Sequence, residues 1–95
     1  IEEGYEAAKI CALNLLSVIK TELGDLDKVQ RIIKIAGYIN SASGFTEQPK
    51  VLNGASEFLL EVFGDKGRHA RAAIGVSELP LDAPLEVEMI VEIKD

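Results

Sequence analysis

The sequence predicts an α+β domain in which two helices form a layer against a β-sheet. Apolar residues recur at helical spacing in residues 2–23 and 47–63. They alternate with polar residues in 85–93, and they occupy 29–40 and 71–77 as two further strands. These observations predict the order α-β-α-β-β for a single domain, and we find no internal repeat or interdomain linker.

Composition and charge restrict the kinds of partner. At 95 residues the chain is a small domain with a limited core, so association with other copies would help to stabilise it. It is 47% hydrophobic and 27% charged, as globular proteins usually are. The net charge of −6 opposes binding to a phosphate backbone, and the ten basic residues form no obvious stripe. We therefore predict no nucleic-acid partner.

The single cysteine, Cys11, bears on compartment and cofactors. It falls within the apolar pattern of the first helix, so one chain contains neither a disulfide nor a cysteine-rich metal site. We expect a cytoplasmic protein without a metal or other cofactor. No apolar run approaches the roughly 20 residues of a membrane span, and no signal-peptide pattern is present, so we predict no membrane partner. Because the sequence enters a helix directly after Ile1, we expect a further N-terminal segment to be missing from it.

The first helix, residues 2–23, carries an apolar stripe and ends at a glycine. Gly24 is predicted to supply the C-terminal stop. Small residues between positions 7 and 12 would let this helix approach the sheet closely. The predicted stripe consists of Ala8, Cys11, Ala12, Leu15, Val18 and Ile19.

Residues 29–40 form a strand with apolar side chains on both faces. One parity holds Ile33, Ile35 and Ile39, and the other holds Ile32, Ala36 and Tyr38. A strand that is apolar on both faces is typical of the interior of a sheet, where both faces are at least partly covered. We therefore predict an interior strand here.

The second helix, residues 47–63, is apolar on two sides. Thr46 is predicted as its N-cap, and Pro49 falls in its first turn. One side holds Val51, Ala55, Phe58 and Val62, and the other holds Leu52, Leu60 and Phe63. Two apolar sides predict two buried contacts, and one small sheet supplies only one of them. A contact with another subunit is the natural second, although loops or a missing N-terminal segment would also serve.

The last two strands carry the most informative polar pair, Arg71 and Glu86. Arg71 stands at the head of a strand face that Gly75 leaves bare, which a strand tolerates where a neighbouring group or a ligand comes close. A guanidinium in this position, beside a strand that offers a carboxylate, could hold a planar anion through two hydrogen bonds. By itself this pair indicates a small-anion site and no particular reaction.

Several short motifs together resemble the RidA/YjgF family. They lie at residues 4–8, 11–16, 23–27, 51–56, 69–71, 79–80 and 86–88. The resemblance is closest to a subgroup with Asn-Gly-Ala-Ser, here residues 53–56, and His-Ala-Arg, here residues 69–71. It covers essentially the whole chain in order, and the combination is much more specific than any one motif.

The resemblance implies a fold and an assembly. The family fold is similar to that of the bacillus-type chorismate mutase, a two-layer sandwich of two helices on a mixed β-sheet. It begins with a β-hairpin that this sequence lacks, so residues 1–95 are expected to be one N-terminally incomplete domain. Family members assemble as homotrimers with clefts between subunits, and such a trimer would explain a helix that is apolar on two sides.

The resemblance also implies an activity that needs no cofactor. Characterised members hydrolyse reactive 2-imino acids to 2-keto acids and ammonia. The family arginine matches Arg71, which would bind the substrate carboxylate, and the family glutamate matches Glu86, which would position or activate water. Asn53 matches an asparagine at the margin of the cleft. The cysteine commonly found two residues after the arginine is Ala73 here, and the mechanism does not strictly require it.

Simpler interpretations remain open for each of these residues. Arg71 would equally suit a surface or interface ion pair, Glu86 a solvated strand face, and Asn53 a polar helix surface. His69 invites a catalytic role because histidine exchanges protons near neutral pH, but no nucleophile or metal-ligand partner is evident, so a structural or rim role is favoured. Ser56, like Ser41, has no triad context in the sequence, and Cys11 is expected to pack in the core.

Two other functions compete with imine hydrolysis. One is a noncatalytic module that binds a small carboxylate or metabolite in the same intersubunit cleft. The other is ribonuclease activity, which has been attached to some family members. The acidic charge and the single histidine make the ribonuclease the weakest of the three hypotheses.

Overall fold

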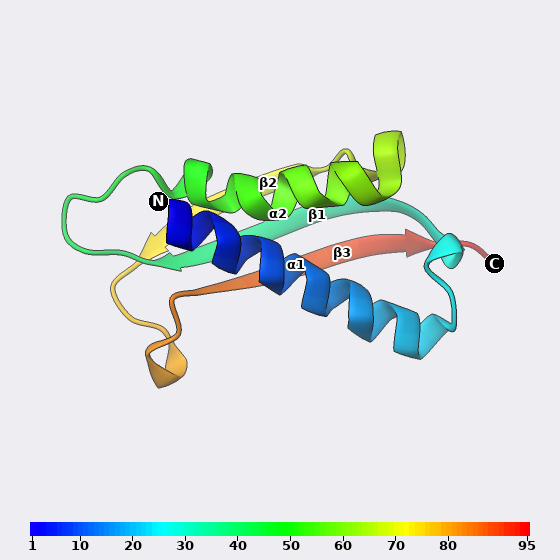
Figure 1. The fold of residues 1–95 in the computed structure, drawn as a ribbon, viewed down its shortest axis with the longest axis horizontal. Coiled ribbons are helices and arrows are strands. Elements are labelled where there is room, and N and C mark those ends of the chain that lie inside the picture. The colour runs from blue at the N-terminus through cyan, green and yellow to red at the C-terminus, as the bar shows by residue number, and fades with distance from the viewer.

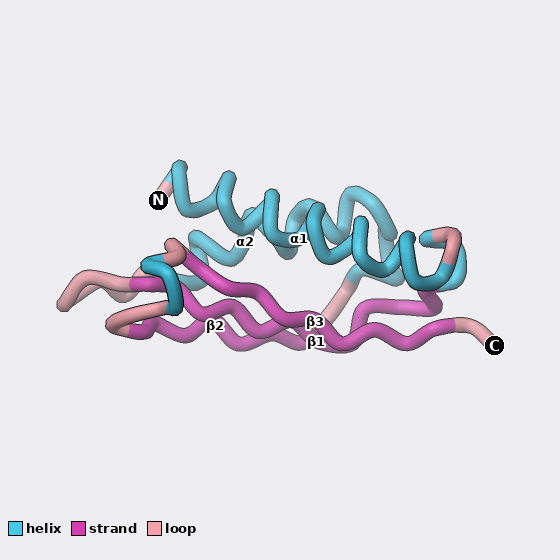
Figure 2. The backbone as a smooth tube through the Cα atoms, turned by 90° about the horizontal axis from the view of Figure 1, so that it is seen from below, coloured by secondary structure: helices cyan, strands magenta, loops and turns pink.

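Two helices lie on one face of a three-stranded sheet in the computed structural model, which describes residues 1–95 (Figure 1). The helices are α1 (Glu2–Leu23) and α2 (Gln48–Phe63), and the strands are β1 (Val29–Asn40), β2 (Ala70–Val76) and β3 (Leu85–Ile93). Short 3-10 turns occupy Leu26–Lys28, Gly64–Gly67 and Pro80–Asp82. Seen edge-on, the helices cover one face of the sheet and leave the other uncovered (Figure 2). The predicted α+β class and element order are confirmed.

The sheet has the order β2-β1-β3, so β1 is its central strand as predicted. β1 runs parallel to β2, with Ile35 opposite Arg71, and antiparallel to β3, with Tyr38 opposite Glu86. The expectation that Arg71 lies beside the strand carrying Glu86 is therefore wrong. A parallel pair needs a crossover connection, here through α2, and this connection places β2 on one side of β1 and leaves the other side for β3.

Helix α1 ends where predicted, but its buried stripe differs from the predicted one. Gly24 adopts the left-handed conformation with φ of 87°, and its N–H donates to the Lys20 carbonyl over 2.7 Å. The fully buried residues are Ala8, Ala12 and Leu16. Val18, predicted to lie on the stripe, is 60% exposed. These three buried residues are spaced four apart along the helix, because α1 packs against α2 as well as against the sheet.

Helices α1 and α2 approach each other closely at Gly54. A Cβ atom at this position would lie 2.0 Å from the carbonyl oxygen of Tyr5, so only glycine fits the crossing. The first-turn position of Pro49 is confirmed, whereas Thr46 is not the cap: Glu47 takes the N-cap position, without a side-chain hydrogen bond. The residues of α2 that pack into the core are Val51, Leu52, Ala55 and Leu59, while Leu60 and Val62 are 41% and 43% exposed.

In strand β1, the residues that face the core do not alternate regularly along the whole strand. Its register with β3 shifts between Val29 and Arg31 and again between Ile32 and Lys34. The second irregularity turns both Ile32 and Ile35 into the core, at 1% and 0% exposure, and leaves Ile33 38% exposed. The predicted grouping of Ile33 with Ile35 is therefore wrong.

The uncovered face of the sheet is partly apolar. It presents Ala36, Tyr38, Ile74, Glu86, Glu88 and Ile90, which share one side of the sheet by strand register. Ile74 and Ile90 are 42% and 56% exposed there.

No helix of the structure has the length and apolarity that crossing a membrane requires.

Candidate functional site

A polar pocket of about 440 Å³ opens where the C-terminal half of α2 faces the start of β2. Its lining consists of Asn53, Ser56, Glu57, Leu60, Arg68, His69 and Arg71, and we call it the Arg71 pocket. Two of the three predicted site residues, Asn53 and Arg71, share this pocket. The alternation of β2 aims Arg71 at α2, and a one-turn spacing along α2 puts Asn53 and Ser56 on one side of the helix.

Arg71 is held by α2 without being neutralised by it. Its Nη1 donates to Ser56 Oγ over 3.1 Å, and its Nη2 donates to the Pro49 carbonyl over 3.3 Å. The ion pairs of the chain join Arg31 to Glu92, Lys50 to Glu47 and Arg68 to Asp65, so Arg71 has no carboxylate partner. A surface ion pair within the chain is thereby excluded for Arg71, and its charge is available to an anionic ligand.

Glu86 lies on the other face of the sheet from Arg71. Its neighbours in β3, Leu85 and Val87, pack toward the helices, so Glu86 points to the uncovered face. Strand spacing and rise put the two Cα atoms roughly 14 Å apart, across β1 and three register positions. One chain therefore does not bring Arg71 and Glu86 together.

A tyrosine and a second glutamate share the uncovered face with Glu86. Tyr38 Oη donates to Glu88 Oε1 over 3.0 Å, and this hydrogen bond to a carboxylate raises the pKa of Tyr38. Glu86 accepts no hydrogen bond from any side chain of the chain, so its carboxylate is free to bind water or a group from another copy.

Sequence reasoning missed a serine–histidine contact in the Arg71 pocket. Ser56 Oγ lies 2.9 Å from His69 Nε2, and His69 Nδ1 lies 2.5 Å from the Gly67 carbonyl oxygen. The sequence shows no triad context for Ser56 and no partner for His69, whereas the structure places these two side chains in contact. Thirteen residues separate the pair, and the turn Gly64–Gly67 closes this distance by folding the chain back along α2. No spacing in the sequence signals it.

The one carboxylate that lines the pocket is already engaged. Glu57 Oε2 accepts a hydrogen bond of 2.5 Å from Tyr5 Oη, and this contact raises the pKa of Tyr5. The tyrosine comes from α1, so it ties the two helices at the rim of the pocket. The groups left to meet a ligand are basic or neutral, a composition that favours an anion.

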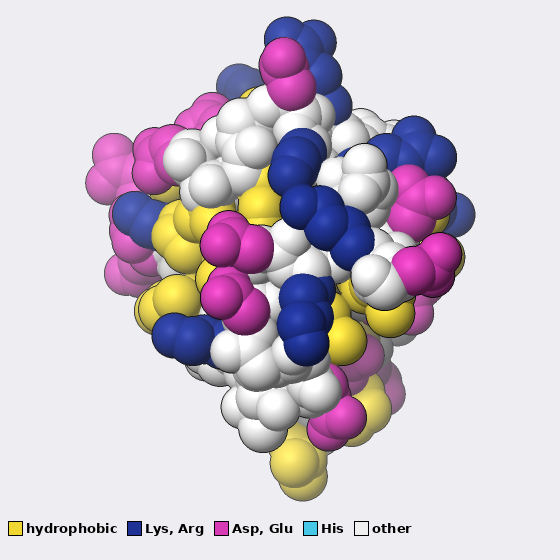
Figure 3. All heavy atoms as spheres, turned by 90° about the vertical axis from the view of Figure 1, so that its right-hand side faces the viewer, with side chains coloured by type: hydrophobic (Ala, Val, Ile, Leu, Met, Phe, Trp, Pro, Cys, Tyr) yellow, Lys and Arg dark blue, Asp and Glu magenta, His cyan; other side chains and the backbone are white.

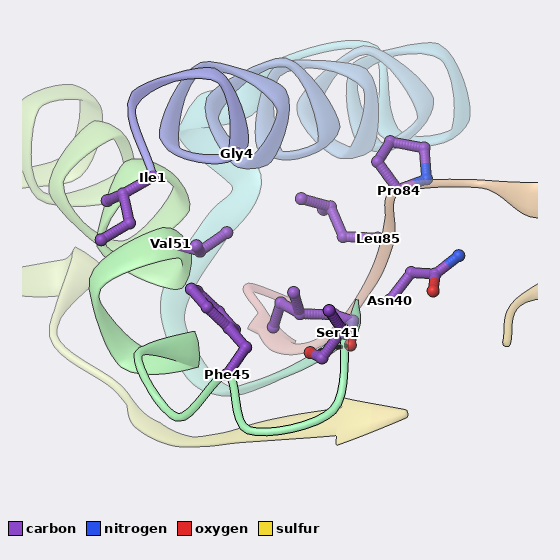
Figure 4. Close-up of a pocket in the computed structure, with 10 residues that line it drawn as sticks. Ile1, Gly4, Asn40, Ser41, Phe45, Val51, Pro84 and Leu85 are labelled. Atoms are coloured by element: carbon purple, nitrogen blue, oxygen red, sulfur yellow. Dashed lines mark hydrogen bonds between the residues drawn. The ribbon is translucent and has the colours of Figure 1, made fainter. Parts of the chain in front are cut away.

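A second cavity, of about 240 Å³, lies near the N-terminal ends of both helices (Figure 4). Ile1, Val51, Phe45 and Leu85 supply much of its wall, with Asn40 and Ser41 at the end of β1. None of its side chains is ionisable, so it offers no acid–base group. No group of three or more His, Cys, Asp or Glu side chains is arranged to hold a metal ion.

The surface charge is mixed where the molecule is seen end-on. Lys and Arg side chains lie down the middle of this face, and Asp and Glu side chains lie close beside them on both sides (Figure 3). A nucleic-acid groove would need a stripe of basic side chains. Recognition of a small anion inside the Arg71 pocket fits the charge distribution better.

The comparison with protein families agrees with the motifs. Residues 1–93 match the sequence profile of a family described as YjgF/chorismate mutase-like, putative endoribonuclease. The chain belongs to the YjgF/chorismate mutase-like family. The predicted family is thereby confirmed, while the Asn-Gly-Ala-Ser and His-Ala-Arg subgroup stays a prediction.

Relatives of this YjgF-family chain span several organisms. Protein TCP17 of Trypanosoma cruzi is 48% identical over 96 residues, which cover 100% of this chain and 60% of that protein. A crystal structure of Atu1372 from Agrobacterium tumefaciens, a protein described as of unknown function, is 45% identical with a TM-score of 0.96 over 99% of this chain and 60% of that one. These matches confirm the predicted two-helix, mixed-sheet fold.

A further solved structure carries a functional description. A putative endoribonuclease from Shewanella oneidensis is 35% identical with a TM-score of 0.93, over 97% of this chain and 61% of that one. The chain thus spans about three fifths of the length of these relatives.

Proposed function

We propose that this YjgF-family chain hydrolyses small 2-imino acids to 2-keto acids and ammonia, without a cofactor, in a cleft between copies of a homotrimer. The observation that carries the proposal is Arg71, which projects into a polar pocket with no carboxylate partner. Nη1 and Nη2 each keep a second N–H beside the one bonded to Ser56 or Pro49, and these two N–H groups match the two oxygens of a substrate carboxylate. Membership of the YjgF family, some members of which hydrolyse 2-imino acids, supports an imino acid as that anion.

The position of Glu86 supports an assembly of several copies. Arg71 and Glu86 point to opposite faces of one sheet, so the proposed reaction needs the glutamate of a neighbouring copy. The uncovered sheet face that carries Glu86 also exposes Ile74 and Ile90, the kind of apolar surface that another subunit buries. The site is therefore proposed to be incomplete in a single chain.

The chemistry requires little more than orientation. Arg71 binds the carboxylate next to the C=N bond, and Asn53 lies in the same pocket to contact the substrate. Glu86 accepts a proton from water, whose oxygen attacks the imine carbon. Glu86 passes that proton to the nitrogen, which gives a carbinolamine. The hydroxyl of the carbinolamine then loses its proton to the nitrogen, its C=O bond forms as the C–N bond breaks, and ammonia and the 2-keto acid leave.

Ammonia release from 2-iminopropionate and 2-iminobutyrate, generated in situ, tests the proposal. We expect Arg71→Ala to lower kcat/KM about 10- to 100-fold, which corresponds to the loss of charge-assisted hydrogen bonds. Arg31→Ala is the matched control, because Arg31 only pairs with Glu92 on the surface, with 59% of its side chain exposed. Equal rates for the two variants would contradict the role of Arg71.

A second pair of variants tests the glutamate. Glu86→Gln keeps the shape of the side chain and removes the base, so we expect a loss of kcat of about 100-fold, within the usual range for a general base. Glu92→Gln is the control on the same strand. No ammonia release by a correctly assembled wild-type protein would overturn the deaminase.

One observation favours the noncatalytic alternative. The only carboxylate lining the pocket, Glu57, is bound to Tyr5, so a single chain holds the parts for anion binding and lacks a free carboxylate base. Titration calorimetry with 2-ketobutyrate distinguishes the two functions. Saturable binding that Arg71→Ala abolishes, without turnover of any imino acid, would select a binding module.

Ribonuclease activity is considered because the family description and the Shewanella oneidensis structure name it. The chain has a net charge of −6 and one histidine, whereas RNA cleavage needs a basic surface and a paired acid and base. We expect a single-stranded RNA oligonucleotide to stay intact with purified protein. RNA cleavage by the wild type that is lost in Arg71→Ala would favour ribonuclease activity over imine hydrolysis.

A further inference from the structure

The Arg71 pocket contains an ordered chain of hydrogen bonds in which two members, Ser56 and His69, have no role in the proposed imine hydrolysis. It runs from the Gly67 carbonyl through His69 to Ser56, and Arg71 joins at the serine. The turn supplies Gly67, helix α2 supplies Ser56 and strand β2 supplies Arg71. The direction of each hydrogen bond follows from the chemistry of its partners.

The backbone carbonyl determines the tautomer of His69. A carbonyl oxygen only accepts, so Nδ1, 2.5 Å away, carries a proton. In the neutral ring Nε2 then has a free lone pair and accepts the Ser56 hydroxyl proton over 2.9 Å. Arg71 Nη1 donates to the oxygen of the same hydroxyl over 3.1 Å. Ser56 is therefore arranged to lose its proton to His69 while a cation faces its oxygen.

The carbonyl that orients His69 is itself held firmly. Gly67 is buried, and a Cβ atom there would lie 2.4 Å from the Leu59 carbonyl oxygen, so the turn packs directly on the backbone of α2. The Arg68 N–H donates to the Asp65 carbonyl over 3.2 Å within the same turn. His69 follows immediately and leads into β2. A nucleophile, a base and a group that orients the base thus occur together.

We propose that Ser56 is a nucleophile activated by His69, and that the Arg71 pocket accepts small carboxylate-bearing esters or amides as acyl donors. Asn53, one turn before Ser56 and lining the same pocket, supplies an amide N–H₂ group for the developing oxyanion. Arg71 binds the carboxylate of the acyl group. This reaction shares Arg71 and Asn53 with the proposed imine hydrolysis but uses neither Glu86 nor a second copy of the chain.

The steps balance without any co-reactant except water. Ser56 Oγ bonds to the carbonyl carbon as its proton passes to His69 Nε2. The carbonyl reforms, the bond to the leaving alkoxide or amine breaks, and the leaving group takes the proton from His69. Water then gives a proton to His69 as its oxygen attacks the acyl carbon. The bond from that carbon to Ser56 Oγ breaks, Ser56 takes the proton back from His69, and the carboxylic acid is released.

A fluorophosphonate probe tests the nucleophile directly, since serine displaces fluoride from phosphorus and retains the phosphonyl group. We expect one adduct in the intact mass of the wild-type protein, and peptide mapping should place it on Ser56. Ser56→Ala should remove the adduct. Ser41→Ala should keep it, because the hydroxyl of this half-buried serine bonds only to the Ile39 carbonyl and the Gln48 side chain. Mapping on the wild type locates the adduct even if a variant fails to fold.

The base and the substrate class have their own readouts. His69→Gln should slow labelling at least about tenfold. Wild-type protein should hydrolyse 4-nitrophenyl hemisuccinate about tenfold faster than the uncharged 4-nitrophenyl butyrate, and Arg71→Ala should remove this preference. An unlabelled wild type, labelling spread over Ser17, Ser43 and Ser77, or labelling unaffected by His69→Gln would overturn the proposal. Ammonia release and adduct mass are separate signals, so either reaction can fail alone.

Discussion

Arg71 is the residue whose surroundings say most about ligand chemistry. It has two hydrogen-bond partners, a serine hydroxyl and a backbone carbonyl, and neither carries a charge. A planar guanidinium in this setting recognises a flat, two-oxygen anion better than a point charge would. The prediction of an anion-binding arginine from the sequence is consistent with this geometry.

The planar, two-pronged geometry of the Arg71 guanidinium should contribute to ligand binding as well as its positive charge. We expect Arg71→Lys to weaken binding of 2-ketobutyrate about tenfold, because lysine keeps the charge and loses the two parallel donors. Titration calorimetry measures the change, with Arg31→Lys as the surface control. Full affinity in Arg71→Lys would mean that a simple positive charge suffices.

Cys11 should respond to pH through its burial. It is half-buried and packs against the core, and burial raises the pKa of its thiol. Because the thiol pKa is higher in the folded state than in the unfolded state, burial of the neutral thiol contributes to the free energy of unfolding. This contribution is complete below the usual thiol pKa of about 8.5 and is lost as pH rises through the folded value. From pH 7 to pH 9.5, the urea midpoint of unfolding should therefore fall further for the wild type than for Cys11→Ala. Equal falls would contradict this account.

At the scale of elements, the contact between α1 and α2 depends on glycine. Gly54 lets the backbone of α2 lie against that of α1, while Leu52 on the next face reaches the sheet at Gly37. The crossing sets how α2 lies over β2, and therefore where Asn53 and Ser56 open into the pocket. Helix packing and site geometry are coupled through this one position.

Gly54→Ala should destabilise the fold although alanine is the better helix former. Alanine gains about 1 kcal/mol of helix propensity. Its Cβ, however, would lie 2.0 Å from the Tyr5 oxygen, so the backbone must shift, and overpacking of this kind costs about 1–3 kcal/mol or more. Urea unfolding should show a net loss of stability. Glu61→Ala, at an exposed position of the same helix, should change stability by less than about 0.5 kcal/mol.

At the scale of the whole molecule, helices on one face leave the other face of a three-stranded sheet uncovered. Of the chain's 95 residues only 16 are buried, and the largest side chains that are fully buried all lie between the sheet and the helices. A second apolar face is expected to be covered by other copies, which would also bring Glu86 toward a neighbouring pocket.

The mass of the protein in solution tests this assembly. Light scattering should give about three times the 10.3 kDa chain mass. Ile74→Asp should lower the mass toward one chain, because it buries a charge in the proposed interface. Ile10→Asp, at a similarly exposed isoleucine on α1, should leave the assembly unchanged. A monomeric wild type, or equal effects of the two variants, would contradict the trimer.

The sequence by itself determined the elements, their order, the family and two members of the Arg71 pocket, because periodicity, caps and motifs are local. Helix α1 and strand β1 have the predicted bounds, and Arg71 and Asn53 line the same pocket. Only the tertiary structure decided that β1 separates Arg71 from Glu86, and that Ser56 meets His69. Both outcomes depend on which segments become neighbours: the crossover through α2 sets the strand order, and the turn packed on Leu59 returns the chain to the helix.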